Sequence, residues 1–260
     1  MTLGLAVLCF LLLLTAVHDV GTDAGLYYSE QTEAGVLPAA GISDDDLKTL
    51  DGALAAYLAG RPNELLLPLD SAPGEYSVLA LRVDGELRPA FNERETAHLA
   101  DCFDLFALLR KVRRRLVPWA VLLIVGGAYL LRDRRRIRRC AALSPLIVLL
   151  PLGAFAAWAA ADFDAAFTFF HRVLFRNDLW LLDPRTDLLI RICPQSMFES
   201  MGLRIALRGL AILAGVPALA AGLTLAWPKQ KRSGKDTWND RDTRRASGAK
   251  RMSFGSGAKR

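Results

Sequence analysis

The sequence predicts an all-α integral membrane protein: a bundle of four transmembrane helices with a small extracytoplasmic cap and a disordered basic C-terminal tail. Of the 260 residues, 52% are hydrophobic, which is more than most soluble domains contain. The hydrophobic residues are grouped into four long runs that hold almost no charge. Arginine clusters lie between these runs, and such clusters set the orientation of a chain across a membrane.

The four hydrophobic runs differ in length. A helix rises about 1.5 Å per residue and needs roughly 17–25 residues to cross the hydrocarbon core. Residues 140–161 and 201–227 are long enough. Residues 1–18 and 116–131 are shorter, and they need flanking side chains that reach the headgroups or a locally thinner bilayer. The first run lacks a basic start and a clear cleavage site, so we interpret it as a retained helix.

Positive charge sets the predicted orientation. Residues 132–139 (RDRRRIRR) form a short basic loop, and residues 228–260 form a tail rich in Lys, Arg, Gly and Ser. The positive-inside rule places both segments, and the N-terminus, in the cytoplasm. The basic run RKVRRR (Arg110–Arg115) then lies on the outer side. The two cytoplasmic segments carry more positive charge than this run, and the reverse orientation would leave the tail outside.

Residues 19–115 are predicted to form the cap. Ser43 precedes three aspartates, a pattern typical of a helix N-terminus. The stretch YSVLALRVDGELRPAF alternates apolar and polar residues around an Asp-Gly pair at 84–85, which predicts a β-hairpin. Asn92 with Glu95 three residues later predicts the start of a second helix that leads towards the membrane.

The second outer segment, residues 162–200, is polar among large aromatic residues. Asp183 followed by proline predicts the cap and first turn of a short helix, and Pro194 marks the approach to the fourth membrane helix. The four cysteines have no spacing that indicates a disulfide framework. The sequence contains no CxxC or HExxH metal motif, no P-loop and no GxSxG nucleophile motif.

All three histidines, His18, His98 and His171, fall on the predicted outer side. A four-helix bundle would bring the last two, on the loops of neighbouring helices, over one face of the membrane. Imidazole titrates near 6.5 and exchanges protons at physiological pH, so this pair is a candidate for acid–base chemistry. Asp101 lies one turn from His98. The alternative is that the histidines are interfacial anchors with no chemical role.

The sequence RNDLW after His171 supports two interpretations. An asparagine amide, here Asn177, can donate a hydrogen bond to an oxyanion, and an aspartate, here Asp178, can fix an imidazole tautomer. Alternatively, both residues only cap a turn that Trp180 anchors in the interface.

Two long blocks of the sequence, FNERETAHLADCFDLF (Phe91–Phe106) and FHRVLFRNDLWLLDPRTDLLIRICP (Phe170–Pro194), resemble the outer signature blocks of the bacterial lipoprotein intramolecular transacylase (Lit) family. The four-span layout and the YYSEQ stretch at the start of the cap are also similar to that family. The resemblance covers most of residues 1–227 and leaves out the tail.

The resemblance implies an O-to-N acyl transfer within one diacylated lipoprotein at the outer membrane–water interface. The acyl chain leaves the glycerol sn-2 ester and arrives on the α-amino group of the N-terminal cysteine. The substrate supplies its own nucleophile, so no cofactor, metal or nucleic-acid partner is implied. The implied catalytic pair is His98 and His171. Substrate-binding or supporting roles are expected for Asn92, Glu93, Arg94, Asp101, Asn177, Asp178, Trp180 and Asp183.

Two other functions remain open from the residues alone. A non-catalytic membrane protein would use the cap to bind a lipid or a protein partner. A metal-dependent lipid hydrolase would use His98, His171 and Asp178 as ligands, although these residues lack the helical spacing of familiar zinc sites.

Overall fold

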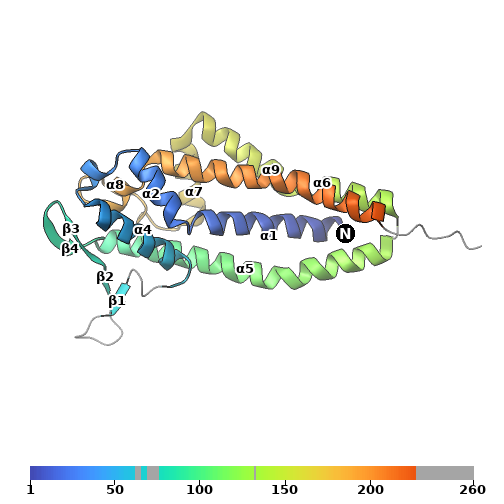
Figure 1. Cartoon of the computed structure of the whole chain (residues 1–260), viewed down its shortest axis with the longest axis horizontal. Helices are drawn as coiled ribbons and strands as arrows, with labels where there is room; N and C mark the ends of the chain where they lie inside the picture. Colours follow the sequence, from blue (N-terminus) through green and yellow to red (C-terminus); the bar gives the residue numbers. More distant parts are fainter. Residues whose placement is uncertain (62–65, 69–75, 132, 227–260) are drawn as a thin grey trace, which may run out of the picture. The chain divides into compact units, whose positions relative to one another are not determined.

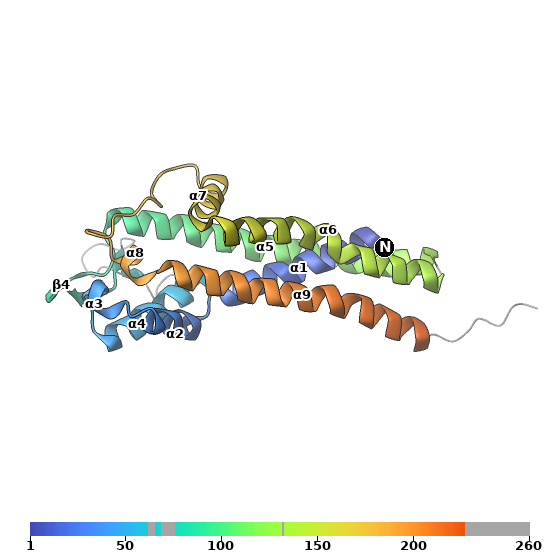
Figure 2. The same cartoon turned by 90° about the horizontal axis from the view of Figure 1, so that it is seen from above.

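The computed structural model describes residues 1–61, 66–68, 76–131 and 133–226. The chain divides into two compact units, Met1–Ala221 and Gly222–Arg260, and the fold below is that of the first. The long helices are α1 (Thr2–Val20), α5 (Glu93–Leu131), α6 (Arg134–Ala161) and α9 (Gln195–Ala226), and all but the end of α9 lies in the first unit. Helix α1 packs against both α5 and α6 (Figures 1 and 2). The predicted disordered tail, residues 228–260, lies outside the described residues.

Within the described residues, three helices are long and apolar enough to cross a membrane: Thr2–Val20, Arg134–Ala161 and Gln195–Leu225. The fourth predicted crossing, residues 116–131, forms the C-terminal part of α5. It is not among those three helices.

Two glycines allow α1 and α5 to approach closely. A Cβ atom on Gly4 would lie 2.7 Å from the Cβ of Leu123 and 2.9 Å from the backbone nitrogen of Ile124. A Cβ on Gly127 would lie 2.7 Å from the Cα of Met1. Small residues at such contacts are the usual means by which membrane helices pack backbone to backbone.

The segment between α1 and α5 carries three short helices, α2 (Ala24–Glu33), α3 (Leu37–Ala40) and α4 (Asp44–Leu58). As predicted, the Ser43 side chain caps α4 by accepting a 3.1 Å hydrogen bond from the Asp46 amide. The core that α4 forms with the start of α5 and with α8 (Leu188–Ile192) is fully buried at Leu47, Leu50, Phe91, Leu188 and Ile192.

A carboxyl group is buried in the same region. Asp51 of α4 is 1% exposed. Burial raises the pKa of Asp51 to about 7, and the neighbouring Gln31 amide on α2 offsets only part of the cost of the charge. Asp51 is therefore a titrating group inside the fold at physiological pH.

The predicted hairpin is present. Strand β3 (Ala80–Val83) pairs antiparallel with β4 (Glu86–Pro89). Asp84 and Gly85 form the connecting pair, with φ of 55° and 87°, which is the backbone of a type I′ turn. A second antiparallel pair, β1 (Leu66–Pro68) with β2 (Tyr76–Val78), was not predicted from the sequence.

Two predicted boundaries were wrong. Residues 134–139, expected in a loop, form the first turns of α6, because the Asp133 side chain caps the helix and arginine favours helix. Asp183 does not start a helix. Its carboxylate accepts the Arg185 amide at 2.9 Å, and its own amide donates to Asp187 at 2.8 Å, so the segment closes into a turn. Helix α8 begins only at Leu188.

Candidate active site

His98 lies in the second turn of α5, and a capping box fixes the start of that helix. The Glu95 amide donates to the Asn92 side chain at 3.0 Å, and the Asn92 amide donates to the Glu95 carboxylate at 2.8 Å. The other carboxylate oxygen of Glu95 accepts the Leu189 amide at 2.6 Å, which joins α5 to α8. The buried carboxylate of Glu95 thus fixes the start of α5, the helix that carries His98, to α8.

His171 lies in the last turn of α7 (Phe163–Leu174), the helix that follows α6 after a turn at Asp162 (Figure 2). Its Nδ1 is 2.8 Å from the backbone carbonyl oxygen of Phe167. A carbonyl oxygen only accepts hydrogen bonds, so the proton of the neutral ring is on Nδ1. The Nε2 atom of His171 therefore carries the free lone pair.

The two imidazoles lie together. Their ring centroids are 6.2 Å apart, and each residue is 8% exposed. The side chain of Phe175 contacts both rings, at 5.1 Å from His98 and 5.6 Å from His171. Further aromatic rings surround His171 at centroid distances of 4.0, 5.5 and 5.0 Å, contributed by Phe167, Phe170 and Trp180.

This apolar surrounding keeps both imidazoles neutral at physiological pH. Burial and, to a lesser extent, the nearby His171 lower the pKa of His98 to about 4, while Asp101 opposes the shift. Burial also lowers the pKa of His171, against the hydrogen bond to Phe167, which raises it. Each ring can therefore donate from one nitrogen and accept at the other.

Cys102 lies one turn after His98 and contacts it. The Cys102 sulfur is 3.7 Å from Nε2 of His98. Burial raises the pKa of Cys102 to about 12, so the thiol keeps its proton and can donate to Nε2. When the thiol donates, the proton of the neutral His98 ring is on Nδ1, a buried atom with no hydrogen-bond partner among the described residues.

The loop after α7 is tied to α5 by two long-range hydrogen bonds. Asn177 donates to the Asp101 carboxylate at 2.9 Å. Arg94 donates to the backbone carbonyl of Asp178 at 2.7 Å. Within the loop, the Trp180 indole donates to the backbone carbonyl of Asn177 at 3.0 Å, which holds the indole against His171. These contacts hold the two histidine-bearing segments together.

The proposed tautomer-fixing role of Asp178 is not what the structure shows. Its side chain is exposed, and no hydrogen bond joins its carboxylate to either imidazole in the described part of the chain. The backbone carbonyl of Phe167 fixes the His171 tautomer instead. Asn177 already donates to Asp101, so its position is explained by the tether.

Three other expected site residues have their contacts elsewhere. Asn92 caps α5 and donates to Asp187 at 2.8 Å. Asp183 pairs with Arg185 at 2.7 Å on the surface. Glu93 is exposed in the first turn of α5. The structure therefore gives these residues no contact with the imidazole pair.

Sequence reasoning missed Phe167, Phe175 and Cys102 as neighbours of the histidines. A signal was present, because Phe167, His171 and Phe175 recur every four residues and Cys102 follows His98 by four. Side chains at this spacing share one face of a helix.

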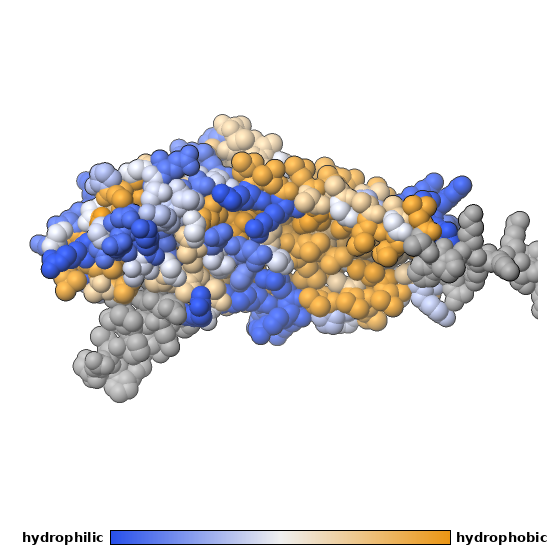
Figure 3. Space-filling model, in the orientation of Figure 1, coloured by the Kyte–Doolittle hydropathy of each residue, from blue (hydrophilic) through white to orange (hydrophobic). Residues whose placement is uncertain are grey.

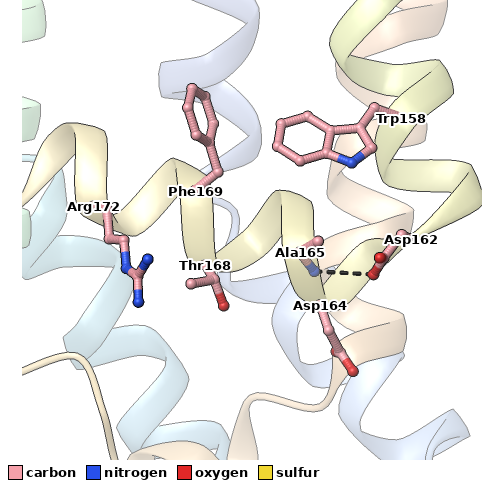
Figure 4. Close-up of a pocket in the computed structure, with 7 residues that line it drawn as sticks. All are labelled: Trp158, Asp162, Asp164, Ala165, Thr168, Phe169 and Arg172. Carbon is pink, nitrogen blue, oxygen red and sulfur yellow. Dashed lines mark hydrogen bonds between the residues drawn. The ribbon is translucent and has the colours of Figure 1, made fainter.

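An open groove lies at the junction of α6 and α7, and His171 is not among the residues that line it. Figure 4 shows Trp158 and Phe169 on one side of α7, with Asp164, Thr168 and Arg172 on the other. Asp162 caps α7 by accepting a 3.0 Å hydrogen bond from the Ala165 amide. The groove is thus separate from the imidazole pair.

Within the part of the chain that the structure describes, no group of three or more His, Cys, Asp or Glu side chains is arranged to hold a metal ion. All four cysteines are free thiols.

The family model of the lipoprotein intramolecular transacylase Lit matches residues 2–198 of this chain. The chain belongs to the Lit family. Members of this family are integral membrane enzymes that transfer an acyl group within a lipoprotein. The search of curated proteins gave no match to this chain.

The fold is similar to that of a solved Lit structure from Bacillus cereus, with 24% identity and a TM-score of 0.57 over 85% of this chain and 91% of that one. Two variants of the B. cereus protein with a substituted histidine also match. One is 23% identical, with a TM-score of 0.55, over 86% of this chain and 88% of that one. The other is 22% identical, with a TM-score of 0.55, over 86% and 90%.

Proposed function

We propose that this Lit family member moves the sn-2 acyl chain of a diacylglyceryl lipoprotein to the α-amino group of its N-terminal cysteine, with His98 and His171 as the catalytic residues. The observation that carries the proposal is the pairing of two buried, neutral imidazoles whose ring centroids are 6.2 Å apart. Their free nitrogens are complementary, since one accepts a proton and the other donates a hydrogen bond.

The reaction needs a base because an α-ammonium group has a pKa near 8. Nε2 of His171 takes a proton from this ammonium, and the amine attacks the carbonyl carbon of the ester. A C–N bond forms, and the carbonyl becomes a tetrahedral oxyanion. The C–O bond to the glycerol then breaks, and the proton held by His171 passes to the leaving glycerol oxygen. The attacking nitrogen loses its second proton to water as the amide forms, so ammonium and ester give amide, alcohol and one released proton.

The assignment of His171 as the base follows from its tautomer and its hydrogen bond. Its Nδ1 donates to the Phe167 carbonyl, which leaves Nε2 as the acceptor and stabilises the ring when it becomes positively charged. His98, with a pKa of about 4, is a weaker base. Its Nδ1 proton is suited to donate to the oxyanion, as preorganised donors do in acyl transfer.

The same proposal includes a topology. The protein crosses the membrane four times, with α5 as the second crossing, both termini in the cytoplasm, and α2–α4 and the hairpins as an outer cap. Exposed apolar side chains after residue 116, such as Leu122 and Val125 at 60% and 63% exposure, support a lipid environment for this part of α5. The substrate ester lies at the same membrane surface as the imidazole pair in this arrangement.

The test is expression of the full chain in a bacterium that makes no lyso-form lipoproteins, followed by mass spectrometry of lipoprotein N-termini. We expect an N-acylated, lyso-form terminus with the native protein. His98→Ala and His171→Ala should each abolish this product, because each removes one of the two reacting nitrogens. The matched control is His18→Ala, since His18 lies outside the imidazole pair.

Immunoblots of the membrane fraction must show equal amounts of each variant. Unchanged diacyl termini with the native protein present in the membrane would refute the proposal. Full activity of either alanine variant would remove that histidine from the mechanism and favour a non-catalytic role.

A further inference from the structure

One face of α5 carries three cations that the proposed mechanism does not use. Lys111, Arg114 and Arg115 are all exposed and lie at i, i+3 and i+4, so they share one side of the helix. None of the three has an ion pair or hydrogen bond within the described residues. Arg110 differs, because it donates to the Leu58 carbonyl and lies over the Phe103 ring at 5.6 Å.

An apolar stripe continues along the same face. Pro118 follows Lys111 by seven residues, Leu122 follows Arg115 by seven, and Val125 follows Pro118 by seven, a spacing that returns to the same side of a helix. Leu122 and Val125 are 60% and 63% exposed. In Figure 3 a hydrophilic patch lies at the lower edge of the molecule over α5, and the surface beyond it is hydrophobic.

The dimensions match one leaflet of a membrane. The ten residues from Arg115 to Val125 rise about 15 Å in a helix. This is half of a hydrocarbon core that is about 30 Å thick. A lipid whose headgroup lies at the three cations would therefore extend its acyl chains along the stripe to the centre of the bilayer.

We propose that this face of α5 is a binding site for an anionic phospholipid, with the headgroup phosphate on Lys111, Arg114 and Arg115 and the acyl chain along Pro118, Leu122 and Val125. The charge favours an anionic lipid over a zwitterionic one, because the nearest carboxylate on the same side of α5 is Asp104, about two turns before Lys111. The stripe favours a lipid over a soluble anion, which would leave it uncovered.

Repulsion among the cations gives the bound anion a structural role. Like charges three and four residues apart destabilise a helix, and Arg114 already lowers the pKa of Arg110 after the effect of burial. An anionic headgroup relieves this repulsion where the apolar part of α5 begins. This site does not depend on acyl transfer, so its test is separate from the test of the enzyme.

The experiment uses the full chain purified in mild detergent, with phosphatidylglycerol or phosphatidylcholine of equal chain length added. We expect native mass spectrometry to show phosphatidylglycerol retained at least several-fold better than phosphatidylcholine. The triple variant Lys111→Gln, Arg114→Gln, Arg115→Gln should lose this preference, and the variant Arg114→Lys, Arg115→Lys should keep it. Circular dichroism checks that each variant is folded.

The matched control is Arg135→Gln, Arg138→Gln, Arg139→Gln, which removes three exposed cations of the same spacing from the start of α6. It should leave most of the preference intact. An equal loss in both triple variants would mean general charge attraction and overturn the site. Glycerol phosphate, which lacks acyl chains, should compete poorly, and equal competition would reduce the site to one for soluble anions.

Discussion

Two neighbours bear on the tautomers of His98 and His171, and both favour a proton on Nδ1. The Phe167 carbonyl requires the proton of the neutral His171 ring to be on Nδ1, and a Cys102 thiol that donates to Nε2 of His98 leaves the proton of that ring on Nδ1 as well. In the proposed mechanism the reacting atom is then Nε2 of His171 and Nδ1 of His98. An acceptor and a donor can thus face one substrate although both residues are neutral histidines.

Cys102 is therefore expected to position His98. Cys102→Val removes the S–H donor, so His98 is free to adopt the other tautomer, and turnover should fall by about 2- to 10-fold, the worth of one ordinary hydrogen bond. Cys102→Ser restores a donor and should retain most of the activity. Lyso-lipoprotein formation against time measures both variants. The role is contradicted if valine and serine variants behave alike.

The buried carboxyl of Asp51 predicts a pH effect on stability. Its pKa of about 7 in the folded chain is above the unfolded value of 3.8, so the folded state binds more protons between these limits. Stability from this group is present below pH 3.8 and is lost as pH rises through 7. Asp51→Asn should raise the melting temperature more at pH 8 than at pH 5, as measured in detergent. A benefit independent of pH would argue against a charged, buried Asp51.

At the scale of elements, the loop after α7 is coupled to α5. Asn177→Ala and Asp101→Ala each break the same 2.9 Å hydrogen bond, so each should lower turnover. Because both substitutions remove one shared interaction, the double variant should be no less active than the less active of the two single variants. Asp178→Asn is the control. The contact of Asp178 to Arg94 uses its backbone carbonyl, which the substitution keeps. Additive losses at Asn177 and Asp101 would exclude the tether.

The sequence could predict the elements whose signals are local. The capping box at Asn92 and Glu95 and the turn at Asp84 and Gly85 depend on neighbouring residues, and both are present. It could not predict the bond from Asn177 to Asp101, which joins residues 76 positions apart. The Asp183 turn was missed because Asp-Pro is equally suited to a helix start, and the competing acceptor, Asp187, is on the far side of the turn.

At the scale of the whole molecule, the topology has a direct test. Four crossings return the C-terminus to the side of the N-terminus, whereas crossings by α1, α6 and α9 alone place the termini on opposite sides. An alkaline phosphatase reporter fused after residue 260 should be inactive, and a green fluorescent protein fusion should be fluorescent. The converse pattern would mean that α5 does not cross.

The contact between His98 and His171 requires the chain between them to cross the membrane an even number of times. Two points on the same surface of a membrane are joined by an even number of crossings, and α6 alone contributes one. A lysine placed at Val125, in the middle of the short apolar part of α5, would therefore do more than weaken insertion. If α5 failed to cross while α6 still did, the two imidazoles would lie on opposite faces of a core about 30 Å thick. The pairing of the two imidazoles therefore depends on the short hydrophobic run of residues 116–131.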